Sequence, residues 1–126
     1  MLSDTDYLNA FLSKAAEIMF YDLQPAPRID VSTRDYESNS VLNYACLWGD
    51  LRAVKLLLAA GADANSVGDM GITPLHNAVG GGFLDVVECL LLNGAKQTTN
   101  SFGYTPLQWA REMNRSEIAN ALQKQI

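Results

Sequence analysis

The chain has 126 residues, of which 48% are hydrophobic and 18% are charged, and its formal net charge is −5. One folded domain is expected, and the negative charge argues against a nucleic-acid partner, because phosphate backbones are bound mainly by clustered Lys and Arg. Residues 1–6 carry no basic side chain and no long apolar run follows them. We therefore expect no secretory signal, no membrane contact and a cytoplasmic location.

The first predicted element is an amphipathic helix over residues 4–21. Asp4 or Thr5 is its expected start, and Pro25 and Pro27 are expected to end it. Its apolar residues recur at helical spacing and are Leu8, Phe11, Leu12, Ala15, Ala16 and Met19. We interpret residues 1–28 as a capping helix with a proline-containing linker, since the end of a repeat stack needs a polar cover. A partner-binding helix is the alternative.

From residue 29 onward the sequence repeats. Ala45, Ala78 and Ala110 recur at spacings of 33 and 32 residues, and the Thr-Pro-Leu of residues 73–75 returns at 105–107 and, as Ser-Val-Leu, at 40–42. The motif residues of the second and third repeats are Thr73, Pro74, Leu75, His76, Thr105, Pro106 and Leu107. Three repeats follow, at about 29–61, 62–94 and 95–126.

Each repeat is predicted to form two helices and a projecting turn. Ser40 and Thr73 are the expected caps of the first helices of repeats one and two, and Ser116 that of the last helix. Gly80 and Gly81 are expected to fray the end of their helix, because glycine is a poor helix former. The predicted buried stripe of the next helix consists of Leu84, Val87, Leu90 and Leu91.

These residues resemble the ankyrin repeat over about residues 29–126. The middle unit carries Thr-Pro-Leu-His at 73–76, a glycine between its helices and Leu-Leu-Leu followed by Gly-Ala at 90–95, whereas repeat one has Asn43 and repeat three has Gln108 in place of His76. The resemblance implies an all-α solenoid of stacked helix-turn-helix units, with β-turn fingers beside a concave groove that binds proteins. It also places Asn65 where asparaginyl hydroxylases modify ankyrin repeats in animals.

Carried over position by position, the resemblance implies partner contacts in the fingers and at the ends of the first helices. They are Arg34, Tyr36, Glu37, Asn39, Trp48, Asp69, Met70, Ile72, Phe102, Tyr104, Glu112 and Met113, and Leu47 and Val67 occupy further positions of this kind. Seven of the twelve are large apolar or aromatic residues, and burying one such side chain is worth about 1.5 to 3 kcal/mol. Alternatively, Trp48 and Met113 pack between repeats.

The charged members of this set suggest the chemistry of the partner. Arg34 stands against Glu37, Asp69 and Glu112, which leaves the predicted site with two net negative charges. A protein partner with basic residues around an apolar patch would match this surface.

We expect no catalytic, metal or cofactor site. His76 is the only histidine, and the resemblance implies a structural role for it. Cys46 and Cys89 lie in apolar segments and are expected to be free, buried thiols, which fits a reducing compartment. Cys46, His76 and Cys89 are too far apart in sequence to suggest a zinc site.

The sequence therefore predicts a non-catalytic protein-binding module that is monomeric on its own. Small size and acidity are also compatible with a stoichiometric inhibitor, for instance an immunity protein that blocks a toxin or another enzyme. The third alternative, an enzyme, would require a reactive cysteine or carboxylate in a pocket.

Overall fold

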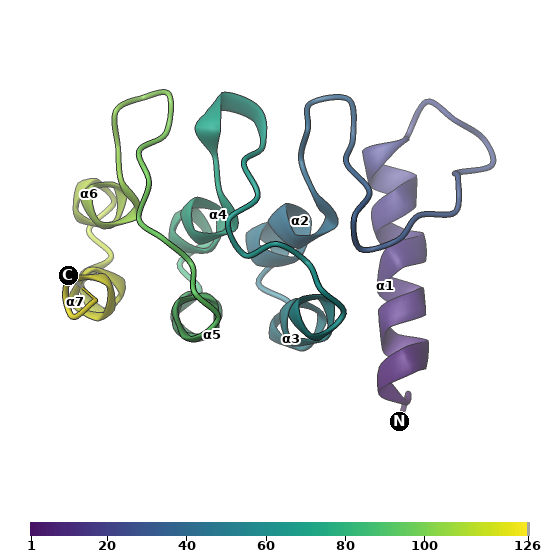
Figure 1. Ribbon diagram of the computed structural model, residues 1–126, viewed down its shortest axis with the longest axis horizontal. Helices are drawn as coiled ribbons and strands as arrows, with labels where there is room; N and C mark the ends of the chain where they lie inside the picture. Colours follow the sequence, from purple (N-terminus) through teal and green to yellow (C-terminus); the bar gives the residue numbers. More distant parts are fainter. Residues whose placement is uncertain (126) are drawn as a thin grey trace.

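The computed structural model describes residues 1–125, which form seven α-helices and one short 3₁₀ turn. Beyond the first helix, the helices lie side by side in two rows (Figure 1). One row contains α2 (Val41–Trp48), α4 (Pro74–Gly81) and α6 (Pro106–Glu112). The other contains α3 (Leu51–Ala59), α5 (Leu84–Leu92) and α7 (Ser116–Gln123). Loops project from the first row along one edge, and the middle loop includes the 3₁₀ turn η1 (Asp69–Gly71).

Each helix of the first row begins with a reciprocal cap. The Ser40, Thr73 and Thr105 side chains accept a hydrogen bond from the backbone N–H three residues later, and the side chain at that later position accepts one from the capping residue's own N–H. This arrangement satisfies N–H groups that the first turn of a helix leaves without partners. The expected caps at Ser40 and Thr73 are confirmed.

The two rows are joined by tight turns in the left-handed region. Gly49, Gly82 and Asn114 have φ values of 70°, 79° and 57°, so Asn114 adopts the conformation of the two glycines. The expected fraying at Gly80 and Gly81 is wrong, because α4 stays helical through Gly81 and ends only at the Gly82 turn. The Gly80 carbonyl accepts a hydrogen bond from Arg115 Nη2 at 3.0 Å, which ties the end of α4 to the next repeat.

The expected ends of two other helices need correction. α1 (Asp4–Met19) is capped by the Ser3 side chain rather than by Asp4 or Thr5, and it ends two residues before Tyr21. It stops well before the prolines because Phe20 has already left helical backbone angles, at φ −127° and ψ 49°. Ser116 lies inside α7 as its first residue, and the cap position is held by Arg115, which makes no capping side-chain bond.

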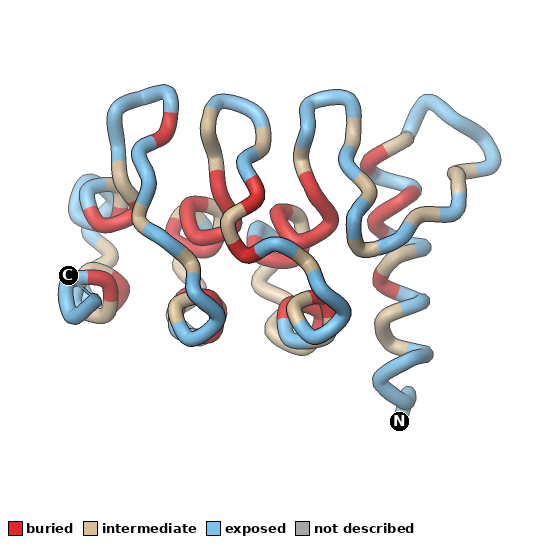
Figure 2. Tube along the Cα trace, viewed as in Figure 1, coloured by how far each residue is buried: buried red, intermediate tan, exposed pale blue. Residues whose placement is uncertain are grey.

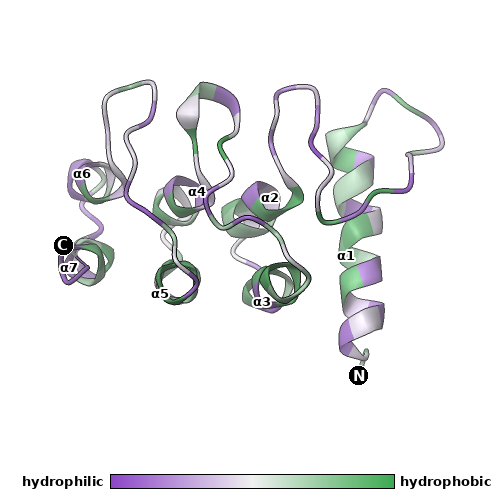
Figure 3. Ribbon diagram, in the orientation of Figure 1, coloured by the Kyte–Doolittle hydropathy of each residue, from purple (hydrophilic) through white to green (hydrophobic). Residues whose placement is uncertain are grey.

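The core lies between the two rows and beneath α1 (Figure 2). In α5, Val87 and Leu90 are buried as expected, but Val86 is buried in place of Leu84 and Leu91, which are only half-buried. Hydrophilic residues lie in the projecting loops and on parts of the helix surfaces, whereas α3 and α5 are largely hydrophobic (Figure 3). No described helix has both the length and the hydrophobicity that a membrane crossing requires.

α1 covers the open side of the first repeat. Its buried residues are Phe11, Ala15, Ala16 and Met19. Tyr7 Oη donates to the Asp50 carboxylate at 2.7 and 2.9 Å, and the Asp50 carboxylate also caps α3 through the Ala53 amide. Arg52 lies over the Tyr7 ring and pairs with Asp4 at 3.2 Å. These contacts hold both halves of α1 against the stack.

Candidate functional site

Three projecting turns form one edge of the molecule, and we call them finger 1 (34–40), finger 2 (67–73) and finger 3 (99–105). In each finger the amide of the second residue donates to the carbonyl of the sixth, at 3.0, 2.8 and 2.9 Å in chain order. This shared hydrogen bond makes the fingers hairpins of the same depth. Their tips therefore line up along one edge, as Figure 1 shows.

Hydrogen bonds also join the fingers to one another. Arg34 Nη1 donates to the Val67 carbonyl at 3.1 Å, and the Asn39 side-chain oxygen accepts from the Asp69 amide at 3.2 Å. The Met70 carbonyl of finger 2 accepts a backbone N–H from finger 3 at 2.9 Å. A surface held in this way loses little conformational entropy when a partner binds.

Five large apolar or aromatic side chains stand exposed on the fingers. They are Tyr36 (68%), Val67 (54%), Met70 (47%), Phe102 (58%) and Tyr104 (37%). Ile72, which the sequence placed in the same set, is half-buried. Exposed apolar residues gathered on one edge are typical of protein interaction surfaces.

The helix-end residues of the predicted site divide between the surface and the core. Met113 and Glu112 are exposed at the end of α6, and Leu47 is exposed on α2. The Trp48 ring instead packs 5.6 Å from Phe11 of α1 and 5.5 Å from the Tyr44 ring of its own helix. The structure therefore places Trp48 beneath the N-terminal helix, and its contact with a partner stays a prediction.

The charged finger residues of the set all face solvent. Glu37, Asp69 and Arg34 are exposed, and Arg34 Nη1 also donates to the Ser38 carbonyl at 2.7 Å and so braces finger 1. Asn39 is committed to finger 2 through the bond described above. These two carboxylates and one guanidinium leave a net negative charge, which favours basic groups on a partner.

A small-molecule site is not supported by the hollow that opens between α2 and α4. It is lined by Asn39, Asn43, Tyr44, Leu47 and Asn77 and has a volume of about 70 Å³. Typical small-molecule sites have volumes of roughly 300 to 1,000 Å³. This hollow is therefore too small to hold a typical small-molecule ligand.

His76 occupies a buried structural position. Its Nδ1 accepts hydrogen bonds from the Thr73 amide at 3.2 Å and from the Thr73 hydroxyl at 2.8 Å. Nε2 must then carry the proton, and it donates to the Tyr104 carbonyl of finger 3 at 3.0 Å. Burial lowers the pKa of His76 below its usual 6.5, although the hydrogen bond to Tyr104 opposes this effect. One side chain thus joins the cap of α4 to the neighbouring finger.

This buried imidazole predicts a loss of stability in mild acid. Below pH 6.5 the unfolded chain binds a proton that folded His76 resists, so the free energy of unfolding should fall as the pH drops from 6.5 toward the lower folded-state pKa. Urea melts between pH 7.5 and 5 would measure this slope. The variant His76→Gln should lose the part of the slope that is due to imidazole, and an unchanged slope would contradict the assignment.

The cysteines show no sign of activation. Both thiols are free and buried, and burial raises the pKa of each. Thiols act as nucleophiles through their thiolate form, so a raised pKa makes them less reactive. Within residues 1–125, no group of three His, Cys, Asp or Glu side chains is placed to hold a metal ion.

Asn65 is held by hydrogen bonds at the boundary between repeats two and three. Its side-chain nitrogen donates to the Gly94 carbonyl at 3.1 Å, and its side-chain oxygen accepts from the Lys96 amide at 2.7 Å. Both ends of the amide therefore serve the packing of neighbouring repeats.

The sequence reasoning missed one exposed apolar group beside finger 1. Ile18, Tyr21 and Leu23 lie at the end of α1 and in the loop that follows it, and they are 45%, 77% and 42% exposed. Ile18 lies outside the buried stripe of α1, and Tyr21 and Leu23 follow the helix, so the apolar residues left out of that stripe were an available signal.

Comparisons with known proteins agree with this architecture. A family model described as "Ankyrin repeats (3 copies)" matches residues 42–126. The chain is 33% identical to the NF-kappa-B inhibitor cactus of Drosophila melanogaster over 115 residues, which are 88% of this chain and 22% of that protein. It is 39% identical to human ankyrin repeat and SOCS box protein 16 over 90 residues, 64% of this chain and 20% of that protein.

A third relative is the RelA-associated inhibitor of Mus musculus. The two are 35% identical over 79 residues, which are 62% of this chain and 10% of that protein. The chain thus spans about a fifth of the length of the first two relatives and less of the third. The similarity therefore concerns only a part of each of these longer proteins.

Proposed function

Because the chain belongs to the ankyrin repeat family, we propose that it is a non-catalytic module that binds a protein partner along its finger edge and adjoining groove. The observation that carries this proposal is the row of exposed apolar side chains on fingers that are hydrogen-bonded to one another. Burying each of these side chains is worth about 1.5 to 3 kcal/mol, so a partner that covered several would bind tightly.

The proposed contact set is the one inferred from the sequence. Finger residues Tyr36, Met70, Phe102 and Tyr104 are the anchors, since exposed aromatic residues often carry much of the binding energy at interfaces. Glu37 and Asp69 favour a partner with basic residues around an apolar patch. We further propose that the chain is monomeric without its partner and works in a reducing, cytoplasmic compartment.

Affinity capture from a lysate of the native source tests this function. The bait is compared with the variant Tyr36→Ala, Met70→Ala, Phe102→Ala, Tyr104→Ala, and Leu92→Ala serves as the control because Leu92 is 88% exposed on an outer helix. We expect one partner to be retained by the wild type and the control and lost by the finger variant, with unchanged circular dichroism in all three. A partner retained equally by all three would show that the finger edge is not the site.

A stoichiometric inhibitor is the second candidate. It is favoured by the names of two relatives, the NF-kappa-B inhibitor cactus and the RelA-associated inhibitor, although the chain covers only part of each. If the captured partner has a measurable activity, an inhibitor abolishes that activity at one equivalent. An adaptor leaves it unchanged.

A further inference from the structure

The end of α1, the loop after it and finger 1 expose four large apolar side chains, Ile18, Tyr21, Leu23 and Tyr36, which we together call the N-terminal patch. Tyr21 and Tyr36 are 77% and 68% exposed, and Ile18 and Leu23 are more than two-fifths exposed. The Leu23 amide donates to the Phe20 carbonyl at 2.9 Å, so the segment after the helix is an ordered turn. Four large apolar side chains are therefore exposed to water at the end of α1, in the turn after it and on finger 1.

Covering the first repeat does not explain this patch. The side of α1 that faces the stack consists of Phe11, Ala15, Ala16 and Met19, which are almost completely buried, and polar contacts to α3 hold the start of the helix. Ile18 and Tyr21 are not part of that buried side. Their exposed side chains add no packing energy to the fold. Exposed apolar residues that gather on one surface are typical of interaction sites.

The patch is continuous with the finger edge. The Phe20 ring packs edge-on against the Tyr36 ring of finger 1, with centroids 5.5 Å apart and an interplanar angle of 87°. Figure 1 shows the loop after α1 rising to the same edge as the three fingers. The end of α1 therefore lies beside finger 1, and the loop after it forms a fourth projection on the far side of α1.

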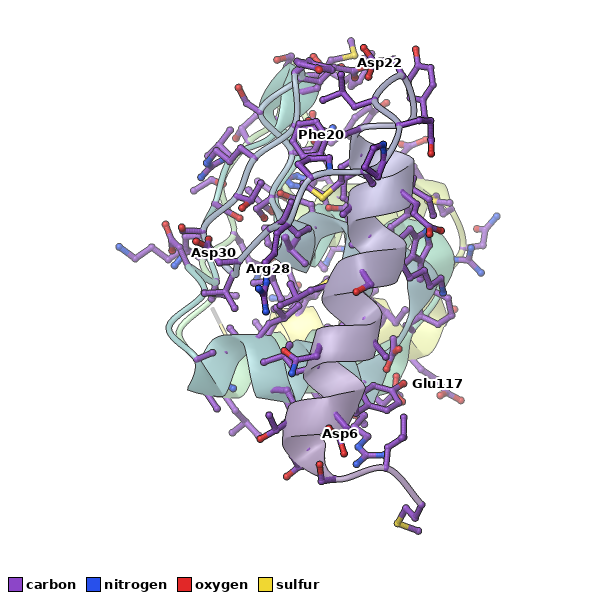
Figure 4. The ribbon with its side chains drawn as sticks, turned by 90° about the vertical axis from the view of Figure 1, so that its right-hand side faces the viewer. Asp6, Phe20, Asp22, Arg28, Asp30 and Glu117 are labelled. Carbon is purple, nitrogen blue, oxygen red and sulfur yellow. The ribbon has the colours of Figure 1, made fainter. Side chains whose placement is uncertain are left out.

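Exposed carboxylates outnumber exposed cations around the patch. Asp22 lies between Tyr21 and Leu23 in sequence, and exposed Glu37 follows Tyr36. Figure 4 shows Asp22 at the upper edge, whereas Arg28 lies well below it. Arg34 of finger 1 is also exposed and keeps its positive charge while it donates to two backbone carbonyls. An apolar surface whose flanking charges are negative on balance is complementary to apolar side chains flanked by Lys or Arg.

We propose that the loop after α1 is a fourth contact element, and that the N-terminal patch binds a segment of the protein partner in which Lys or Arg flanks apolar residues. The inference rests on the function proposed above and extends its site beyond the repeats. α1 then has two roles, because one side covers the stack and its end enlarges the binding edge. A helix that only capped the stack would need only the side that covers it.

Selection from a random library of short displayed peptides tests the proposal with a defined probe. Peptides selected on the full chain are synthesised, and their affinities are measured by fluorescence anisotropy. The variants are Tyr21→Ser with Leu23→Ser, Asp22→Asn with Glu37→Gln, and Met70→Ser with Phe102→Ser, and Leu92→Ser is the matched control. All of these positions except Glu37 and Asp22 are apolar and exposed, so thermal melts should confirm that every variant is folded.

We expect selected peptides to combine Lys or Arg with aromatic or aliphatic residues. Tyr21→Ser with Leu23→Ser should weaken their binding about tenfold, as loss of interface anchors does. Asp22→Asn with Glu37→Gln should reduce the salt dependence of binding, and the control should bind as the wild type does. Amide chemical shifts of residues 18–23 in the unaltered chain should move when peptide is added.

The alternatives give different results. If Met70→Ser with Phe102→Ser weakens binding but the Tyr21 and Leu23 variant does not, the finger site stands and the fourth contact element is refuted. Selection of acidic peptides, or of none, overturns the proposed partner chemistry. Peptide binding that no edge variant alters contradicts both the inference and the proposed function. Self-association that the Tyr21 and Leu23 variant abolishes would show that a second copy of the chain covers the patch.

Discussion

Leu75→Ala is expected to lower the free energy of unfolding by about 2 to 5 kcal/mol, the range measured for leucine truncations in packed cores. Leu75 is fully buried in α4, the helix in the middle of its row, so its removal leaves a cavity with repeats on both sides. Each repeat is stabilised mainly by its neighbours, and a loss at the centre weakens two interfaces together.

The matched comparison for Leu75 is Phe102→Ala. Phe102 is 58% exposed on finger 3, so its truncation should change stability by only about 0.5 kcal/mol. Urea melts of both variants against the wild type measure the difference. Losses of similar size would show that Phe102 is packed in solution and would remove it from the proposed binding edge.

His76→Ala is expected to lower the free energy of unfolding by about 3 kcal/mol, because a buried polar group without its partner costs about 1 to 3 kcal/mol. The substitution removes the acceptor of the Thr73 amide and the donor to the Tyr104 carbonyl, at a side chain that is only 1% exposed. It should also loosen finger 3, since the bond to Tyr104 joins that finger to α4.

His76→Gln separates the contribution of the helix cap from that of the hydrogen bond to the Tyr104 carbonyl. Gln108, at the same position of the third repeat, accepts from the Thr105 amide at 2.9 Å, so a glutamine can complete this helix cap. We expect His76→Gln to lose less stability than His76→Ala in chemical denaturation. Faster amide hydrogen exchange in finger 3 would report a broken bond to Tyr104. Equal losses in the two variants would mean that the cap itself contributes little.

Much of the fold follows from the sequence because many of its signals are local. The Ser40 and Thr73 caps act within a few residues and predicted the starts of α2 and α4, and the 32- to 33-residue period predicted the repeats. The predicted helix ends were wrong where contacts with distant segments determine them. α4 continues through two glycines and is held by Arg115 of the next repeat, and α1 ends where Phe20 turns to meet Tyr36.

The candidate site shows the same division. The sequence alone placed the apolar residues Tyr36, Met70 and Phe102 on turns, because turn positions depend on the local period. Only the tertiary structure decided that Trp48 packs under α1 and that Arg34 and Asn39 join the fingers to one another. It also decided that the end of α1 lies beside finger 1. Those contacts join residues far apart in the chain, and their geometry depends on how the helices stack.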